Sequence, residues 1–217
     1  MSDLTLHKVL RRAATGLARR ADAVRIRRDL RLAGVPDAAA IPTYTTPAEL
    51  ALLYELGRAC PGNARALEIG SYVGASACYI AAGLRRGGGT LYCVDTWQNQ
   101  TMPSGERDTF AEFSRNTSGL ATGLIILRKP SATLTRADVP EPLDFIFIDA
   151  DHTYQSVKAD FERVSPWLSE KGVIALHDHA EYIGVARTIG EALISGRWTV
   201  SAQVENLLCL RRAKYVV

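Results

Sequence analysis

Two groups of residues in this chain have side chains and spacings suited to ligand binding or catalysis. The first is a turn with two glycines, Glu68-Ile69-Gly70-Ser71-Tyr72-Val73-Gly74, which follows a short apolar run. Gly70 lets the backbone turn sharply and leaves space for a ligand. A helix that begins after Gly74 would offer unpaired N–H groups to electron-rich ligand atoms. Asp95, at the end of a second apolar run, could bind a ribose diol, so the pattern indicates a cofactor that contains a nucleoside.

The charge of this turn separates two classes of cofactor. A dinucleotide site uses Gly-x-Gly-x-x-Gly for the close approach of a pyrophosphate, and the turn lacks that pattern. Glu68 at the strand end would repel a phosphate, because both groups are negative. It suits the amino group of a cationic, phosphate-free ligand such as S-adenosylmethionine. We therefore expect a methyl donor rather than a dinucleotide.

The second group follows two later apolar runs. Asp149-Ala150-Asp151-His152 comes after one of them, and His177-Asp178-His179 comes after the next. In a parallel sheet these two strand ends can be neighbours, which would bring three of the four histidines beside two or three aspartates. Carboxylates suit a hard divalent ion such as Mg²⁺, and a set that includes histidine could hold Mn, Fe or Zn. Such an ion would bind a substrate hydroxyl and lower its pKa, and His152 has an intrinsic pKa suited to a base.

The order of apolar segments predicts the elements that position these residues. Strand-like runs alternate with helical patterns, which is typical of an α/β, doubly wound, mostly parallel sheet. An antiparallel C-terminal hairpin would complete seven strands. Ligands in such sheets bind outside the carboxyl ends of the strands, beside the first one. The expected strands are 65–69, 90–95, 124–127, 143–148 and 171–176, with the hairpin at 198–204 and 207–211.

Helix starts and one long connection complete the expected domain. Thr46-Pro47 combines a capping hydroxyl with a proline in the first turn, and Asp151 or Thr153 can cap a later helix. The connection 97–120 is expected to carry a short helix near 106–113. Loops of this length over the ligand end of a sheet are more often functional than not, so we expect a substrate lid there.

A basic arm precedes this domain. The first 35 residues carry nine Lys and Arg against three Asp, so the remaining residues sum to −3 in a chain of net charge +3. We expect residues 1–40 to form a basic amphipathic helical arm and residues 41–217 to form one domain. The apolar face of the arm could pack on the domain, join subunits of a homo-oligomer such as a dimer, or touch an anionic membrane surface. The arm lacks aromatic residues, which argues against nucleic acid as a partner.

Other bulk features favour a cytoplasmic protein. No apolar stretch is long enough to span a membrane, and the first residues do not resemble a secretion signal. The four cysteines are scattered and include no Cys-x-x-Cys pair, as expected in a reducing compartment.

With these motifs the sequence resembles the metal-dependent O-methyltransferases, a branch of the class I S-adenosylmethionine methyltransferases with catechol, caffeoyl-coenzyme-A and macrocin-like members. The resemblance covers about residues 41–212 and implies a Rossmann-like methyltransferase fold. It implies that Trp97 flanks adenine, that Ser131 meets the adenine edge, and that Glu68 lies near the amino group of the donor. The residues implied to bind the cofactor are Thr46, Glu68, Gly70, Ser71, Tyr72, Gly74, Ser76, Asp95, Trp97, Ser131 and Asp149.

The resemblance also implies a metal site with Asp149, Asp178 and His179 as ligands. Two positions depart from the catechol-type pattern. His152 stands where those enzymes carry a lysine base, as in sugar-modifying relatives, and His179 replaces an asparagine or aspartate. His177 could ligate instead of His179, or simply orient a neighbouring side chain. We expect S-adenosylmethionine and a divalent cation as cofactors, and His152 as the general base.

The expected reaction is methyl transfer to a hydroxyl of a small polar acceptor, such as a sugar or another natural product. One alternative keeps the donor but uses His152 without a metal. Another is a methyltransferase-like scaffold without activity, in which the arm serves a partner. Binding of S-adenosylmethionine separates the scaffold from both enzymes.

Overall fold

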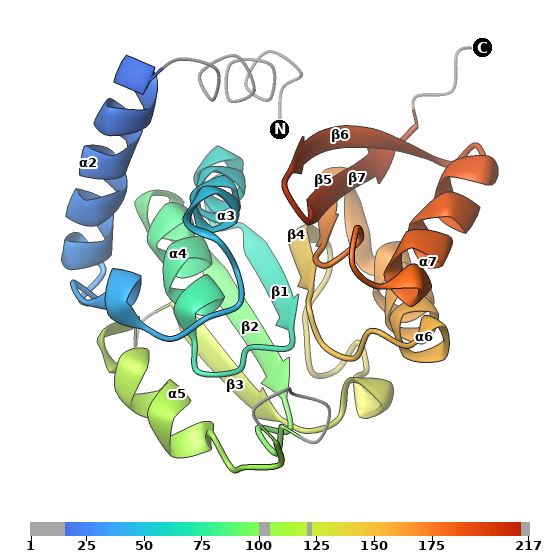
Figure 1. Ribbon diagram of the computed structural model, residues 1–217, viewed down its shortest axis with the longest axis horizontal. Coiled ribbons are helices and arrows are strands. Elements are labelled where there is room, and N and C mark those ends of the chain that lie inside the picture. The colour runs from blue at the N-terminus through green and yellow to red at the C-terminus, as the bar shows by residue number, and fades with distance from the viewer. Residues whose placement is uncertain (1–15, 100–104, 121–122, 214–217) are drawn as a thin grey trace.

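The computed structural model describes residues 16–99, 105–120 and 123–213 (Figure 1). Its centre is a seven-stranded sheet with the strand order β3-β2-β1-β4-β5-β7-β6. The first five strands of the chain run parallel, and β7 lies antiparallel between β5 and β6. The predicted doubly wound sheet with an antiparallel C-terminal hairpin is confirmed. The strands are β1 Arg65–Ile69, β2 Thr90–Asp95, β3 Leu124–Arg128, β4 Leu143–Ile148, β5 Leu168–Leu176, β6 Trp198–Val204 and β7 Leu207–Arg212.

Helices cover both faces of the sheet, and each face has its own hydrophobic cluster. This explains why β4 is nearly all apolar, since a strand covered on both faces needs no polar side. One face carries α2 Gly16–Leu32, α3 Pro47–Ala59, α4 Ala75–Leu84 and α5 Phe110–Asn116, and the other carries α6 Tyr154–Val164 and α7 Ile183–Ile194. Short 3₁₀ helices occupy Ala38–Ala40, Arg85–Gly87, Ser118–Leu120, Ser131–Thr133 and Ser165–Trp167.

Helix α3 begins where the sequence predicts, and its start shapes the functional end of the sheet. The Thr46 hydroxyl accepts a hydrogen bond from the Glu49 N–H at 3.3 Å, and the Glu49 carboxylate accepts one from the Thr46 N–H at 2.8 Å. This reciprocal pair is a capping box, which satisfies two backbone donors at the helix start. Both side chains are thereby fixed at one end of the helix.

The described part of the basic arm packs on the domain. In α2, Ile26 and Leu30 are buried in the cluster that α3 and α4 also build. The Asp29 carboxylate is buried beside them and accepts a hydrogen bond from the Tyr54 hydroxyl at 2.7 Å. The apolar residues at helical spacing in the arm, Leu6, Val9, Leu10, Ala13, Leu17, Ala21 and Val24, define its expected apolar face. Val24 is instead 70% exposed. Most of that expected face lies in residues 1–15, outside the described residues.

The carboxyl end of β1 lies between β2 and β4, which is the switch point of a doubly wound sheet. The Gly70 N–H donates to the Val94 carbonyl at 2.9 Å, and the Asp149 N–H donates to the Ile69 carbonyl at 2.8 Å. A Cβ atom at Gly70 would lie 2.0 Å from the Asp149 carbonyl oxygen, and the φ angle there is +87°. Only glycine fits such an approach, so this residue brings the two predicted groups into contact.

Two elements differ from their expected bounds by at least three residues. The short helix in the long connection is Phe110–Asn116 rather than about 106–113, because Asp108 accepts a hydrogen bond from the Phe110 N–H and marks the start. Strand β5 starts at Leu168 instead of 171.

All four cysteines are free thiols. Among the described residues, no helix has both the length and the apolar character that a bilayer crossing requires.

Candidate active site

A pocket of about 340 Å³ opens at the carboxyl ends of β1, β4 and β5. Residues from both predicted groups share it, so the structure brings the glycine turn and the acid–histidine residues to one cavity. Pocket residues from the predicted site are Thr46, Gly70, Ser71, Tyr72, Ser76, Asp149, His152 and Asp178. Glu49, His177, Tyr44 and Tyr182 also line it.

Asp95 holds the glycine turn in shape. One carboxylate oxygen accepts hydrogen bonds from the N–H groups of Ser71 at 2.8 Å and Tyr72 at 3.0 Å, and the other accepts one from Trp97 at 2.7 Å. Tyr72 has a φ angle of +45°, which a non-glycine residue adopts only when its surroundings hold it there. Asp95 is therefore a positioning residue for the turn, and its contact with a ribose stays a prediction.

Glu68 lies fully buried below the turn. Its carboxylate accepts hydrogen bonds from the Ser71 hydroxyl at 2.6 Å and the Cys93 thiol at 3.2 Å, while Oε1 has no partner. Burial raises the pKa of Glu68 to about 7, although hydrogen bonds from Ser71, Ser76 and Cys93 oppose the shift. A buried acceptor without a partner is costly. Oε1 therefore suits a cationic group brought by a ligand.

This raised pKa predicts how stability depends on pH. The folded state holds a proton on Glu68 up to about pH 7, whereas the unfolded chain releases it near its ordinary value of 4.5. The contribution of Glu68 to stability is therefore full below pH 4.5 and is lost as the pH rises through 7. Glu68→Gln should gain on the order of 3 kcal/mol of unfolding free energy relative to wild type between pH 4.5 and 8. Urea unfolding of the ligand-free proteins measures this difference.

Glu162→Gln is the matched control for this change, because the Glu162 side chain is 65% exposed on α6. The difference in unfolding free energy between Glu162→Gln and wild type should stay nearly constant between pH 4.5 and 8. A pH-independent difference for Glu68→Gln would show that the buried carboxyl group ionises normally in the folded state.

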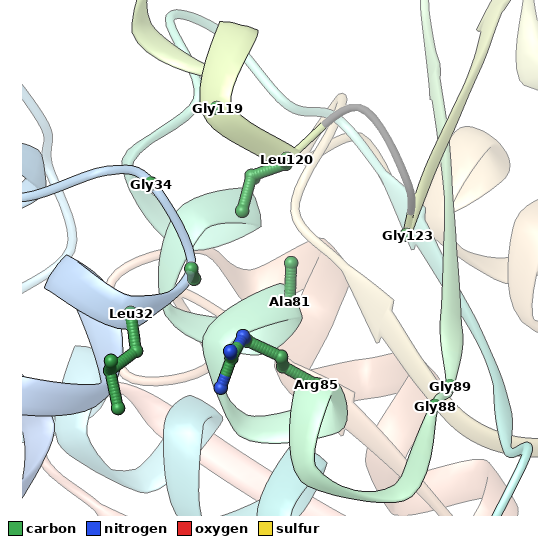
Figure 2. A pocket seen from close by; sticks show the side chains of 10 residues that line it. Leu32, Gly34, Ala81, Arg85, Gly88, Gly89, Gly119, Leu120 and Gly123 are labelled. Carbon is green, nitrogen blue, oxygen red and sulfur yellow. The ribbon is translucent and has the colours of Figure 1, made fainter.

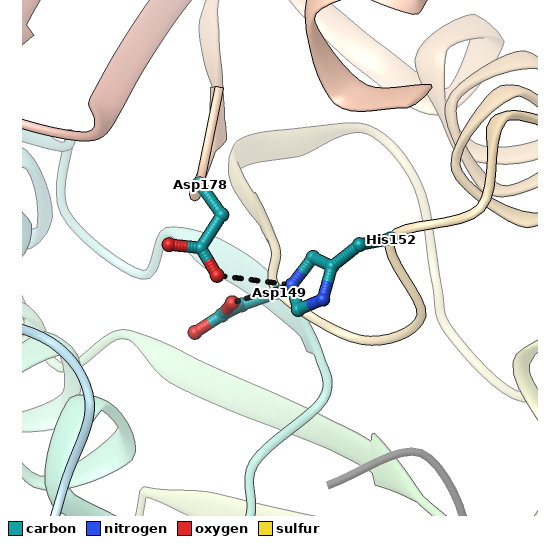
Figure 3. A group of neighbouring side chains, drawn as sticks. All are labelled: Asp149, His152 and Asp178. Atoms are coloured by element: carbon teal, nitrogen blue, oxygen red, sulfur yellow. Dashed lines mark ion pairs between the residues drawn. The ribbon is translucent and has the colours of Figure 1, made fainter. Parts of the chain in front are cut away.

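The acid–histidine residues form one cluster at the ends of β4 and β5 (Figure 3). His152 Nε2 lies 3.1 Å from an Asp178 oxygen and 3.8 Å from an Asp149 oxygen. His177 Nδ1 lies 3.3 Å from Asp149 Oδ1 and 3.2 Å from Asp178 Oδ1. Asp178 has a φ angle of +61°, so its backbone is in the left-handed region. The expectation that these two strand ends are neighbours is confirmed.

These contacts shift the pKa values of all four groups. Burial alone would lower the pKa of each histidine, but close contact with the two negatively charged aspartates outweighs it, raising the pKa of His152 to about 9 and that of His177 to about 11. Burial acts against ionised Asp149 and Asp178, yet the histidines hold both carboxyl pKa values below their usual range. At neutral pH the ligand-free cluster therefore pairs two carboxylates with two imidazolium groups.

The cluster also has a donor set that fits a divalent cation. Ligand atoms of Asp149, His152 and Asp178 all lie within 4.8 Å of one another. His152 Nε2 is buried and makes no hydrogen bond, because its close contact with Asp178 lacks the required geometry. Carboxylate oxygens with an imidazole nitrogen suit Mg²⁺ or Mn²⁺ and also Fe²⁺ or Zn²⁺.

Besides Glu68 and Asp95, four predicted site residues do not line the pocket: Gly74, which caps the start of α4, and three that lie elsewhere. His179 is turned to the hairpin, where its Nε2 is 3.2 Å from Gln203 Nε2, and it is not one of the three residues whose ligand atoms lie together, so its role as the third metal ligand stays a prediction. Trp97 is fully buried, with ring centroids 5.2 Å from Phe110 and 4.7 Å from Phe113, so it packs in the core and does not line the pocket. Ser131 lies outside the pocket lining, in the 3₁₀ helix after β3.

Sequence reasoning missed Glu49 and Tyr182. Glu49 is 1% exposed and lies 3.1 Å from His177 Nε2, although the two residues are 128 positions apart. The only sequence signal for Glu49 was its place three residues after Thr46, which marks a helix start. Tyr182 stacks on the His152 ring with centroids 4.2 Å apart, and no sequence motif predicts this contact.

Another pocket, of about 350 Å³, lies between the C-terminal ends of α2 and α4 and the turn before β3 (Figure 2). Its lining is mainly glycine, with Leu32, Leu120 and the single charged residue Arg85. It lies at the amino ends of β2 and β3, and its lining among the described residues includes no acid, histidine or cysteine. The groups suited to chemistry therefore belong to the first pocket.

The fold and the first pocket together define a protein of the Rossmann-like methyltransferase class. The family described as Methyltransferase domain matches residues 67–179, just over half of the chain, and the protein belongs to this family. The matched segment runs from β1 to the end of β5, so it includes both groups of pocket residues.

Solved structures share this fold. The O-methyltransferase from Bacillus cereus in complex with SAH is 19% identical, with a TM-score of 0.63 over 87% of this chain and 90% of that chain. The O-methyltransferase NovP is 16% identical, with a TM-score of 0.61 over 76% of this chain and 79% of that chain. CalS11, a TDP-rhamnose 3'-O-methyltransferase of calicheamicin biosynthesis, is 18% identical, with a TM-score of 0.52 over 75% of this chain and 76% of that chain. The Rossmann-like methyltransferase fold expected from the motifs is confirmed.

Proposed function

We propose that this protein transfers the methyl group of S-adenosylmethionine to a hydroxyl of a small polar acceptor, such as a sugar or another natural product. The observation that carries the proposal is one pocket lined by the glycine turn and by the acid–histidine cluster, with Gly70 directly against Asp149. Membership of the methyltransferase family supports the donor. The sugar acceptor draws support from the similar fold of an enzyme described as a TDP-rhamnose methyltransferase.

The glycine turn forms the donor half of the pocket. Gly70 keeps this region open, and Ser71 and Ser76 offer hydroxyls beside it. Glu68, whose Oε1 has no partner, would supply negative charge to the cationic donor once it has released the proton that it holds up to about pH 7. Thr46 closes the other side, where its hydroxyl also donates to Glu205 in the hairpin turn.

The acid–histidine cluster forms the acceptor half. A divalent cation bound to Asp149 and Asp178 would bind the acceptor hydroxyl and lower its pKa. His152 then takes the hydroxyl proton as general base. The two carboxylates raise the pKa of His152 to about 9, and this pull weakens when a cation shares their charge. Tyr182, stacked on the imidazole, keeps the ring in place.

Exposed rings at the rim fit an acceptor with a flat apolar face. Tyr44 is 57% exposed and lies 6.0 Å from the Tyr72 ring, and Tyr182 is 40% exposed on the other side. Tyrosine rings bind sugar and aromatic faces while their hydroxyls stay hydrated.

Homo-oligomerisation and a cytoplasmic location remain predictions of the sequence.

A metal-independent methyl transfer is the second candidate, because the two histidines already neutralise the aspartates without an ion. Removing divalent ions with a chelator distinguishes the metal-assisted reaction from the metal-independent one. With tritiated S-adenosylmethionine and a panel of nucleotide-linked sugars and catechols, removal of divalent ions should lower turnover about a hundredfold, since metal assistance supplies several kcal/mol. Added Mg²⁺ or Mn²⁺ should restore it. Unchanged turnover after chelation would favour the metal-independent reaction, and absence of S-adenosylmethionine binding would refute both.

A further inference from the structure

His177 has no role in the reaction as described so far, yet it is the most enclosed member of the cluster. It is 3% exposed at the end of β5. Nδ1 lies almost equally far from Asp149 Oδ1, at 3.3 Å, and Asp178 Oδ1, at 3.2 Å. Ligand atoms at right angles around an ion with bonds of 2.0–2.1 Å are about 3 Å apart. Nδ1 thus lies at the spacing of a neighbouring ligand from each of the two oxygens.

The other ring nitrogen of His177 has a fixed partner. Nε2 lies 3.1 Å from Glu49 Oε2. A neutral imidazole that offers Nδ1 as an acceptor carries its hydrogen on Nε2, which can then donate it to this oxygen. Glu49 is itself held by the N–H groups of Thr46 at 2.8 Å and Asn206 at 2.7 Å. The helix start and the hairpin turn therefore fix the orientation of the imidazole.

We propose that His177 Nδ1, oriented by Glu49, is the third protein ligand of the cation that Asp149 and Asp178 hold. This inference rests on the cation of the proposed function. Histidine ligands usually donate their second ring N–H to a carboxylate, which fixes the tautomer and raises the basicity of the ligating nitrogen. The Glu49–His177 pair has this arrangement.

The assignment also separates the roles of the three neighbouring histidines. His152 is on a loop after β4, and its Nε2 is nearer to Asp178, at 3.1 Å, than to Asp149, at 3.8 Å. Its second nitrogen has no carboxylate partner among the described contacts, unlike that of His177. His179 is turned to Gln203. With His177 as ligand, His152 is left to accept the proton of the acceptor.

The test uses Mn²⁺ as the only ligand and protein labelled with ¹⁵N at histidine. Electron–nuclear double resonance detects histidine nitrogen bound directly to Mn²⁺. The coupling should persist in His152→Ala and His179→Ala and disappear in His177→Asn, whose amide can still donate to Glu49. Loss of the coupling in His152→Ala with retention in His177→Asn would overturn the assignment, as would a wild-type protein that binds Mn²⁺ without any nitrogen coupling.

A second variant tests Glu49 as a positioning residue. Glu49→Gln should weaken Mn²⁺ binding about ten- to hundredfold, the usual effect of removing an outer partner of a metal ligand. Tyr54→Phe is the control, because it removes a buried hydrogen bond from the same helix far from the pocket. It should lower stability and leave Mn²⁺ affinity unchanged. Equal affinities in Glu49→Gln and wild type would overturn the role of Glu49.

The outcomes separate this inference from the function on which it rests. If Mn²⁺ binds without His177, the assignment fails while the metal-assisted reaction stands. If wild type binds no Mn²⁺, the assignment and the cation of the proposed function fall together. Methyl transfer, measured separately, then decides whether the donor half of the proposal survives.

Discussion

Gly70→Ala is expected to yield no folded protein that binds S-adenosylmethionine. The new Cβ would lie 2.0 Å from the Asp149 carbonyl oxygen, where no real Cβ atom fits, and the neighbour is backbone that cannot move without breaking the β1–β4 pairing. The φ angle of +87° adds the cost of a left-handed backbone, about 1–2 kcal/mol. Together these terms should exceed about 4 kcal/mol, a large part of the 5–15 kcal/mol that stabilises a typical domain.

Thermal unfolding by circular dichroism and calorimetric titration with S-adenosylmethionine measure the two effects. Gly190→Ala is the matched control, because Gly190 is in α7 with nothing within 4 Å of an added Cβ. Alanine there should be neutral or stabilising by about 0.5–1 kcal/mol. A Gly70→Ala protein that melts with wild type and binds the donor normally would contradict the close contact between the two halves of the site.

His152→Ala is expected to lower kcat about a thousandfold, within the range for loss of a general base. The donor should still bind, because the glycine turn is unchanged. A base acts only when unprotonated, so the wild-type rate should rise with pH until His152 has lost its proton. That rising limb should be absent from the variant. Turnover with excess acceptor, measured from pH 6 to 10, gives both quantities.

His179→Ala is the control for this substitution. It removes a histidine from the same strand-end region, but one that contacts Gln203 outside the pocket. Its turnover should stay within about twofold of wild type, as for most surface substitutions. If His179→Ala lowers turnover and His152→Ala does not, His152 is not the general base. The result would instead support His179 as the metal ligand that the family resemblance implies.

Much of the fold could be predicted because it depends on local patterns. Alternating apolar runs and helix caps predicted every strand and the capped start of α3. The ends of β4 and β5 could be predicted as neighbours because parallel strands place their carboxyl ends at one edge. That rule predicted that the side chains after these strands lie together, and Asp149, His152 and Asp178 do.

The remaining features depend on contacts that no local pattern encodes. Asp178 has a left-handed backbone, and of its two neighbouring histidines His177 contacts the aspartates while His179 contacts Gln203. Glu49 reaches His177 through tertiary packing across 128 positions. Trp97 was expected beside the cofactor, but α5 supplies the phenylalanine rings that bury it.

Magnetic resonance on the ternary complex tests most directly whether the donor and the activated oxygen share one cavity. The methyl-¹³C signal of bound S-adenosylmethionine should broaden beyond detection when one equivalent of Mn²⁺ is added. Mg²⁺ should leave it sharp, and Asp178→Asn should abolish the broadening. A sharp methyl signal in a protein that has demonstrably bound both S-adenosylmethionine and Mn²⁺ would contradict the account, because the two ligands would then occupy separate sites.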